Sequence, residues 1–461
     1  MPTDRRTLLA LSSALLAGMA GCTTDNEPTS NGDPNGNGSS FEYDGDFPEL
    51  EFVTDPDLEP ELLAEQIHEN VAFSLDLLEQ LRTEEPDENL FFSPYSVSVA
   101  LAMTRAGARG ETAAEMADAL RYELENDDLH GAFGALEDEF ERRNEDGSEV
   151  DDPYGTDDDE TDDEDDLGFE LSSANAVWVD DEFELEEDYL ELLEVYYEAG
   201  ERLVDFAGSP EEARQEINAW VEEQTNDRIE DLLPESTISE STRLVLTNAV
   251  YFLAAWKHDF DPADTAPGPF TSLGGSETEV ELMHQREELR YAEVDGHQLV
   301  ELPYANDDTS MVVVLPAEGE FESFEESLTV DRLATMLGET SRPEVDLALP
   351  KFGIESAFSL VDVMQELGME RAFGGGADFS GMADGDSSDL YVGDIVHESF
   401  LEVDEEGTEA AAATAVVMDE SAAAEQVEIT VDRPFLFYVR DRPTETPLFF
   451  GRVIDGETLQ D

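Results

Sequence analysis

The mixture of hydrophobic patterns along the chain predicts an α+β fold. Segments with helical spacing and segments with strand character follow one another without the regular βαβ rhythm of a parallel sheet. Hydrophobic residues make up 40% of the 461 residues, which is enough for a real core despite the high charge. The C-terminal stretch from Val427 to Val453 alternates as paired strands do.

The first half of the predicted core is mainly helical. Apolar residues recur on one face from Ala64 to Leu81, and a short buried strand that runs into a turn is expected over Asn89 to Ser96. Further helices are expected over Val97–Arg105, Thr112–Leu120, Glu187–Tyr197 and Pro210–Gln224, and a strand over Phe169–Val179.

The second half is richer in strands. Apolar, strand-like runs cover Leu244–Phe252, Met311–Leu315 and Val345–Leu349, and a helix is expected over Leu360–Leu367. Between a helix and the strand expected at Phe169–Val179, residues 144–168 contain the acidic run Asp157–Asp166, which repels itself and stays solvated. We therefore expect an acidic insertion there.

The charge balance excludes one class of partner. The chain has 116 Asp and Glu against 23 Lys and Arg, a formal net charge of −93. Acid spread over an otherwise globular pattern indicates a halophilic protein, because concentrated salt screens the self-repulsion within a few ångströms. Nucleic acid is not an expected partner, since nothing would neutralise its phosphates.

The N-terminus resembles an export signal. Arg5-Arg6 precede the apolar stretch Leu8 to Ala17, which is too short to span a membrane. This twin arginine resembles that of a Tat-type export signal. Met19-Ala20-Gly21-Cys22 resembles a lipobox. We expect residues 1–22 to be a lipoprotein signal and the lipidated Cys22 to hold the exported protein at the cell surface, its only attachment to the membrane. An ordinary signal peptide cleaved nearby is the alternative.

The sole cysteine cannot form an internal disulfide. Residues 23–61, rich in Asn, Gly, Asp, Ser and Pro at their start, are expected to form a flexible tether to a domain over residues 62–457.

A run of small residues from Glu405 to Met418 is the most informative feature. With strand alternation, one face carries no charge. That face holds Thr408, Ala410, Ala412, Thr414, Val416 and Met418. The other face carries one charge, Glu409, beside Ala411, Ala413, Ala415 and Val417. Gly407 stands at the entry, where a hinge needs conformational freedom. Alanine also favours helices, so the run alone leaves helix and strand open.

The run resembles the reactive-loop hinge of serpins, and other serpin-like blocks occur in order over most of the chain. They are Asn89–Ser96 with Ala106–Thr112, Ile217–Val221, Leu246–Phe252 with Trp256 and Phe260, Pro350–Phe352, Ile395–His397 and Val431–Phe437. The resemblance implies a serpin fold of three β-sheets and eight or nine helices with an exposed reactive-centre loop. Hinge and loop would occupy residues 405–426.

The resemblance also implies a function. A protease would cut the loop as a substrate, and the cut loop would insert into the largest sheet before the acyl-enzyme is hydrolysed. The hinge residues implied are Glu405, Gly407, Thr408, Glu409, Ala410, Ala411, Ala412, Ala413 and Thr414. Ser93, Asn248 and His397 would form a polar cluster that controls sheet opening, with Trp256 and Glu405 near the top, where insertion starts.

The position of the scissile bond stays open. Counting back from Pro434 favours Glu420-Ser421, whereas counting forward from the hinge gives Ser421-Ala422, and a shorter loop moves the cut to near Ala423. Glu before the cut suits a Glu-specific protease, and Ser or Ala suits subtilisin-like or elastase-like enzymes.

The leading hypothesis is a monomeric inhibitor of serine proteases, with subtilisin-like enzymes as candidate targets. A serpin directed at cysteine proteases, a non-inhibitory binding protein and a solute-binding lipoprotein are the alternatives. An enzyme is not expected, because nucleophile-elbow, HExxH, P-loop and Rossmann motifs are absent. We predict no cofactor and no metal, since the six histidines lack ligand spacing.

Overall fold

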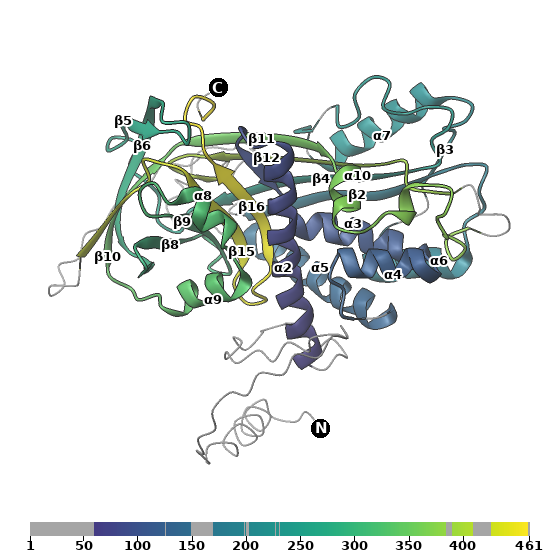
Figure 1. Ribbon diagram of the computed structural model, residues 1–461, viewed down its shortest axis with the longest axis horizontal. Helices are drawn as coiled ribbons and strands as arrows, with labels where there is room; N and C mark the ends of the chain where they lie inside the picture. The colour runs from purple at the N-terminus through teal and green to yellow at the C-terminus, as the bar shows by residue number, and fades with distance from the viewer. Residues whose placement is uncertain are drawn as a thin grey trace, which may run out of the picture. The chain divides into compact units, whose positions relative to one another are not determined.

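Three β-sheets form the framework of the computed structural model, and helices pack around them (Figure 1). The structure describes residues 60–124, 126–148, 169–197, 199, 202–225, 227–229, 231–383, 390–408 and 426–459. Nine α-helices lie within these residues. The α+β architecture of three sheets and nine helices confirms the predicted fold class.

One six-stranded sheet contains two of the three 12-residue strands among the described residues, and it is called the seam sheet below. Its order is β11 (Phe352–Ser359), β12 (Asp394–Val403), β13 (Gly407–Thr408), β4 (Leu244–Ala255), β2 (Phe169–Asp180) and β3 (Leu203–Val204). β12 also pairs directly with β4, in parallel, over most of its length. The short β13 lies between them only at one end.

The second six-stranded sheet is antiparallel throughout and is called the antiparallel sheet below. Its order is β1 (Leu90–Phe92), β16 (Pro447–Val453), β15 (Phe435–Asp441), β9 (Thr309–Leu315), β8 (His297–Pro303) and β7 (Arg290–Val294). A four-stranded sheet has the order β14 (Gln426–Thr430), β10 (Glu344–Pro350), β6 (Glu277–Glu288) and β5 (Ala266–Thr271).

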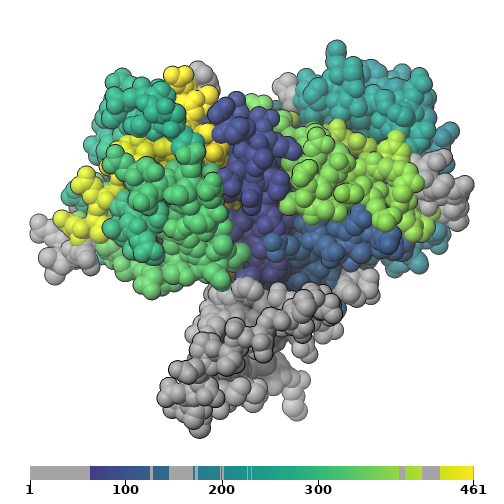
Figure 2. All heavy atoms as spheres, viewed as in Figure 1, coloured from purple at the N-terminus to yellow at the C-terminus, as the bar shows by residue number. Residues whose placement is uncertain are grey.

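The helices gather mainly at the N-terminal half of the chain. They are α2 (Pro60–Glu84), α3 (Pro94–Gly107), α4 (Gly110–Ala119), α5 (Asn126–Ser148), α6 (Glu187–Tyr197), α7 (Pro210–Gln224), α8 (Phe321–Glu326), α9 (Val330–Gly338) and α10 (Val361–Glu366), with a 3₁₀ turn at Arg371–Phe373. In Figure 2 the side chains of α2 form a purple column across the middle of the face shown. Among the described residues, none of these helices is long and apolar enough to cross a bilayer.

The helix α3 shows why the sequence folds as it does. Its residues are small or apolar on nearly every side, and such a helix is stable only when it is buried. Pro94 occupies the first turn, where no backbone N–H is needed, and the Ser93 side chain accepts a hydrogen bond from the Ser96 N–H as an N-cap. The helix therefore begins at a fixed point inside the protein, next to β1.

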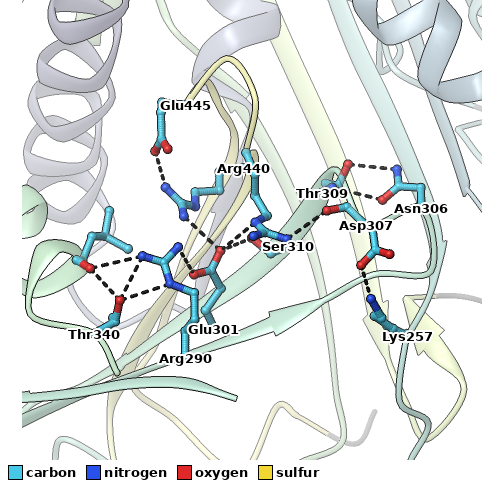
Figure 3. Close-up of polar contacts among 12 residues, drawn as sticks. Lys257, Arg290, Glu301, Asn306, Asp307, Thr309, Ser310, Thr340, Arg440 and Glu445 are labelled. Carbon is cyan, nitrogen blue, oxygen red and sulfur yellow. Dashed lines mark hydrogen bonds and ion pairs between the residues drawn. The ribbon is translucent and has the colours of Figure 1, made fainter. Parts of the chain in front are cut away.

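The antiparallel sheet carries a buried ion network (Figure 3). Glu301 of β8 lies between Arg440 of β15 and Arg290 of β7, each with a nitrogen 2.9 Å from one of its oxygens. Ser310 of β9 also donates to Glu301, and Glu445 pairs with the other side of Arg440. Although burial alone raises it, the pKa of Glu301 is lowered, because Arg440 and Arg290 stabilise its charge. The network joins four strands of this sheet.

Two predicted boundaries differ from the structure. Helix α5 extends to Ser148, so the first residues of the predicted insertion 144–168 belong to a helix, and Asn144 binds the backbone of Leu171 in β2. Helix α2 begins at Pro60, just inside the predicted tether. Residues 149–168, the signal 1–22 and the tether up to residue 59 lie outside the described residues.

Candidate functional site: the seam between β4 and β12

The pairing between β4 and β12 changes along their length. From Asp394 opposite Val245 to Phe400 opposite Tyr251 the two strands are direct parallel neighbours. Beyond that point β13 lies between them, with Thr408 opposite both Val403 of β12 and Ala254 of β4. β13 is antiparallel to both neighbours. The seam is thus closed at one end and already holds two residues of a further strand at the other.

Glu405 anchors the chain just before β13. Its carboxylate lies 2.6 Å from Lys351 Nζ and accepts a hydrogen bond from Thr265 Oγ1 at 2.7 Å. Its carbonyl accepts from the Phe260 N–H at 2.8 Å. Burial alone raises the pKa of Glu405, but the Lys351 and Thr265 contacts outweigh it and lower that pKa. The residue therefore stays ionised and fixes where the segment enters the sheet.

Trp256 lies at this entry. Its indole N–H donates to the Asp404 carbonyl at 3.0 Å, and its backbone N–H donates to the Glu406 carbonyl at 2.9 Å. The indole ring stacks on Tyr304 with centroids 4.6 Å apart. The neighbouring Lys257 pairs with Asp307 (Figure 3). Trp256 therefore holds the segment that precedes β13.

Gly407 is required by close packing. A Cβ at this position would lie 2.2 Å from the carbonyl oxygen of Ala254 and 2.8 Å from the Ala255 Cα. Both contacts are with backbone, which cannot rotate away. Any side chain here would push β13 out of the seam.

A second group of polar residues, which we call the His397 cluster, lies under the closed part of the seam. His397 of β12 is fully buried, and Asn248 of β4 stands directly opposite it in the pairing. His397 Nε2 accepts a hydrogen bond from the Ser93 backbone N–H at 3.1 Å. Its Nδ1 lies 3.2 Å from the Asn248 carbonyl oxygen and also contacts Asn248 Oδ1. These contacts hold β12, β4 and the start of α3 together.

The hydrogen bonds fix the protonation state of His397. Because Nε2 accepts a hydrogen bond, the proton is on Nδ1, which donates to Asn248. Burial lowers the pKa of His397 to about 4, since the surroundings offer no charge to stabilise an imidazolium. The cluster is neutral over the pH range in which most proteins operate.

Two further members of the His397 cluster escaped the sequence prediction. Asn248 Nδ2 donates to Ser96 Oγ at 2.6 Å and to Asn175 Oδ1 of β2. Ser96 Oγ donates in turn to Asn175 Oδ1 at 2.7 Å. The signal in the sequence is an asparagine in the middle of the apolar strand predicted over Phe169–Val179. The structure thus brings Ser93, Asn248 and His397 together, while Trp256 lies apart from them at the entry.

The opposite face of the seam carries Glu398. Burial raises the pKa of Glu398 to about 7, and the negative charges of Glu355 and Asp231 add to the effect. Above the seam on this face, α7 and the segment after it pack on β2, β4 and β12. Their buried cluster includes Ile217, Val221, Val245, Ala249 and Val396.

Several predicted site residues lie outside the described residues. They are Cys22, the hinge positions Glu409 to Thr414 and the candidate scissile positions Glu420, Ser421 and Ala422. Within the described part of the chain, no group of three metal-ligating side chains could hold a metal ion.

Known proteins are similar to this chain in sequence over most of its length. The chain is 38% identical over 387 residues to a serpin-like protein of Thermococcus kodakarensis, covering 83% of this chain and 84% of the relative. It is 34% identical to Serpin B3 of Homo sapiens and to leukocyte elastase inhibitor A of Mus musculus, covering 83% of this chain and 97% of each relative.

Solved serpin structures have the same fold as this chain. The native state of the thermophilic serpin Tengpin superimposes with a TM-score of 0.73 at 27% identity, covering 88% of this chain and 97% of that one. Uncleaved ovalbumin gives a TM-score of 0.72 at 25% identity over 85% of this chain. The model of the family described as serpin (serine protease inhibitor) matches residues 68–456. The chain belongs to the serpin family.

Proposed function

We propose that this protein inhibits serine-type endopeptidases as a suicide substrate. The target protease cuts the loop after β13, and the segment that begins at Gly407 then extends between β4 and β12. The protease, still bound as an acyl-enzyme, is carried along and inactivated. The observation that carries this proposal is β13 itself, a strand of two residues already paired on both sides at the open end of the seam.

The strand pairing supports the proposal. β13 pairs Thr408 with Val403 and Ala254, and each further residue of an antiparallel strand moves one step back along β12 and β4. Continued in this way, Thr414 comes between His397 and Asn248, which are opposite each other in the closed seam. The two sets of pairing agree, so one added strand would fit without any slip of β12 relative to β4.

The side chains also alternate in the required sense. In β12 the odd-numbered residues from Ile395 to Val403 are buried, whereas Glu398, Phe400 and Glu402 are partly or fully exposed. The even-numbered loop residues, Thr408 to Met418, would therefore face the core, and these are the uncharged ones. Glu409 would lie opposite the exposed Glu402. Insertion buries no charge on the core face.

The His397 cluster fits a gating role. Its members are neutral and joined by hydrogen bonds, which cost little to exchange for the hydrogen bonds of a new strand. An ion pair at this place would resist separation more strongly. We propose Glu420-Ser421 as the scissile bond, with Ser421-Ala422 as the neighbour, and subtilisin-like or Glu-specific enzymes as targets.

The place of action is part of the proposal. Lipidation of Cys22 after Tat export would hold the inhibitor at the cell surface, and the net charge of −93 suits a concentrated salt solution. Wild type should appear in the membrane fraction and a Cys22→Ala variant outside it. Equal partition of the two proteins would contradict lipidation.

The test is a denaturing gel of the full chain after incubation with subtilisin, and separately with a Glu-specific protease, in concentrated salt. Inhibition predicts a band at the summed mass that survives denaturant, and sequencing of the released C-terminal peptide identifies the scissile bond. Cleavage of the loop by both enzymes with no stable adduct would contradict the proposal and favour a non-inhibitory role. An adduct with a papain-like enzyme instead would redirect it to cysteine proteases.

A further inference from the structure

A cavity of about 460 Å³ lies where α3 turns into α4. Arg105 of α3, Arg109 and Gly110 of the turn, Ala113 of α4, His130 of α5 and Leu192 of α6 line it. The alanine and leucine side chains provide apolar walls. Among the lining residues that the structure describes, the charged side chains are two arginines, and none is a carboxylate.

Arg105 is the most informative residue of the cavity. It lies in the last turn of α3 and is partly buried, and its Nε is shielded from solvent without a hydrogen-bond partner. The guanidinium lies 6.0 Å from the ring centre of Tyr122. It forms no ion pair with any residue that the structure describes, in a chain with 116 acidic residues. A shielded guanidinium nitrogen without an acceptor among the described residues leaves a hydrogen bond that an acceptor from outside the chain can supply.

Arg109 is held in place by the protein itself. Its Nη1 donates to the Ala106 and Ala108 carbonyl oxygens at 2.8 and 2.7 Å, which fixes the side chain against the end of α3. Asp378 lies close to Gly110. The pKa of its carboxyl group is lowered, mainly by hydrogen bonds with Ser380 and to a smaller extent by the charge of Arg109. The charge of Arg109 is thus partly balanced, and that of Arg105 is not.

His130 completes the polar side of the cavity. It is 2% exposed, and its Nδ1 lies 2.7 Å from the Tyr197 hydroxyl, which fixes the ring. The start of α4 is on the same side, with Arg109 as an N-cap residue whose side chain makes no capping hydrogen bond. The first-turn N–H groups of α4 and two guanidinium groups therefore favour negative charge here, and Asp378 balances part of the charge of Arg109 but not that of Arg105.

We infer that this cavity, called the Arg105 cavity below, binds a small oxyanion, the carboxylate or phosphate group of a compact metabolite. A guanidinium presents paired N–H groups that match the two oxygens of either group, and the apolar walls suit a short hydrocarbon body. At about 1 M salt the screening length is near 3 Å, so distant acidic residues do not repel the ligand.

Equilibrium dialysis of the full chain in concentrated potassium chloride tests this, with labelled inorganic phosphate in one series and labelled benzoate in another. Wild type should bind at least one probe saturably, and the series that binds identifies which oxyanion the cavity takes. Arg105→Gln should weaken binding at least about tenfold, as expected for the loss of a charge-assisted hydrogen bond. Arg342→Gln, which removes an exposed arginine outside the cavity, should bind as wild type does.

A second variant keeps the charges and removes the space. Ala113→Leu should fill part of the cavity and block the probe, while its circular dichroism stays that of wild type. Absence of saturable binding to wild type would overturn the inference. Equal weakening in Arg105→Gln and Arg342→Gln would also overturn it, because the effect would then be one of net charge.

Discussion

The seam sheet and the antiparallel sheet differ in the chemistry that holds their central strands together. In the seam sheet, β4 and β12 are parallel neighbours joined at their centre by the neutral side chains of Asn248 and His397. In the antiparallel sheet, the buried Glu301 of β8 pairs with the half-buried Arg290 of the adjacent β7 and with the buried Arg440 of β15, which lies on the far side of β9. Separation of the first pair exposes neutral groups that another strand can satisfy, whereas separation of the second would leave buried charges unpaired.

Aromatic packing reinforces the difference. In the antiparallel sheet, Phe91 of β1 stacks on Phe449 of β16 with centroids 5.1 Å apart, and Tyr438 of β15 stacks on Phe450 of β16 at 5.2 Å. In the proposed insertion, the core-facing loop residues from Thr408 to Thr414 are Ala and Thr, which need little room. Small, neutral groups between one pair of strands lower the cost of separating that pair, while buried ion pairs in the other sheet raise the cost of separating its strands.

A charge on the inserting face should produce the largest change. Thr408→Arg would place a guanidinium beside Val403 and Ala254, both buried, and desolvation of an unpaired charge costs several kcal/mol, roughly 3 or more. The variant should be cut by the target protease without forming an adduct. The stoichiometry of inhibition, measured by titration of residual protease activity, checks this.

Glu409→Arg is the matched control, because the opposite face of the inserted strand lies beside the exposed Glu402. This variant should still trap the protease. If Thr408→Arg traps as efficiently as Glu409→Arg, the face assignment is wrong.

The ion network of the antiparallel sheet should govern stability and not trapping. Glu301→Gln leaves Arg440 with a buried, poorly compensated charge and should lower the free energy of unfolding by about 3–5 kcal/mol. Denaturant unfolding at fixed salt measures this. Asp346→Asn, which breaks the exposed pair with Arg286, should cost at most about 1 kcal/mol. A comparable cost in both variants would remove the distinction between the two kinds of pair.

His397 should make the native state sensitive to acid. Its pKa is about 4 in the folded chain against an ordinary 6.5, so the unfolded chain binds more protons between these values. The stability due to the neutral imidazole is fully present above about pH 6.5 and lost as pH falls toward 4, about 3 kcal/mol in total. Unfolding curves across this range should show the loss in wild type and a shallower one in His397→Gln. Parallel profiles would contradict a neutral, buried imidazole.

Glu398 should act in the opposite direction and more weakly. Its pKa of about 7 in the folded chain lies above the ordinary 4.5. The stability that its protonated form gives the folded state is therefore present at low pH and is lost as pH rises through this window. Glu398→Gln should therefore stabilise the protein at pH 8 by about 1–2 kcal/mol, allowing for solvent screening. Near pH 4.5 the variant and wild type should match, and a constant offset at both pH values would disprove the titration.

Long, strongly patterned elements were predictable from the sequence. The helix Pro210–Gln224 was predicted to its ends, because proline occupies its first turn and apolar residues recur at helical spacing. The buried strand Leu244–Ala255 was predicted over most of its length, since both of its faces are covered and nearly all its residues are apolar. In such elements, the buried positions can be recognised directly from the apolar residues of the sequence.

Elements with much polar surface escaped the prediction. Strand β6, Glu277–Glu288, alternates acidic and apolar residues and was missed, as was α5 despite buried Leu129, Phe133, Leu136 and Phe140 at helical spacing. At the seam, family motifs pointed to His397 and Asn248. The sequence could not link Asn175 to them. Asn175 lies 73 residues before Asn248, and the two side chains meet only because β2 pairs with β4.

The most direct test of the central claim is the thermal unfolding of the full chain before and after its loop is cut, with salt and pH held fixed. If the seam between β4 and β12 accepts the loop as a new strand, the cut protein should unfold at a markedly higher temperature than the intact one. The same Thr408→Arg variant, cut in the same way, should show little gain. An unchanged unfolding temperature for the cut wild type would contradict insertion at this seam.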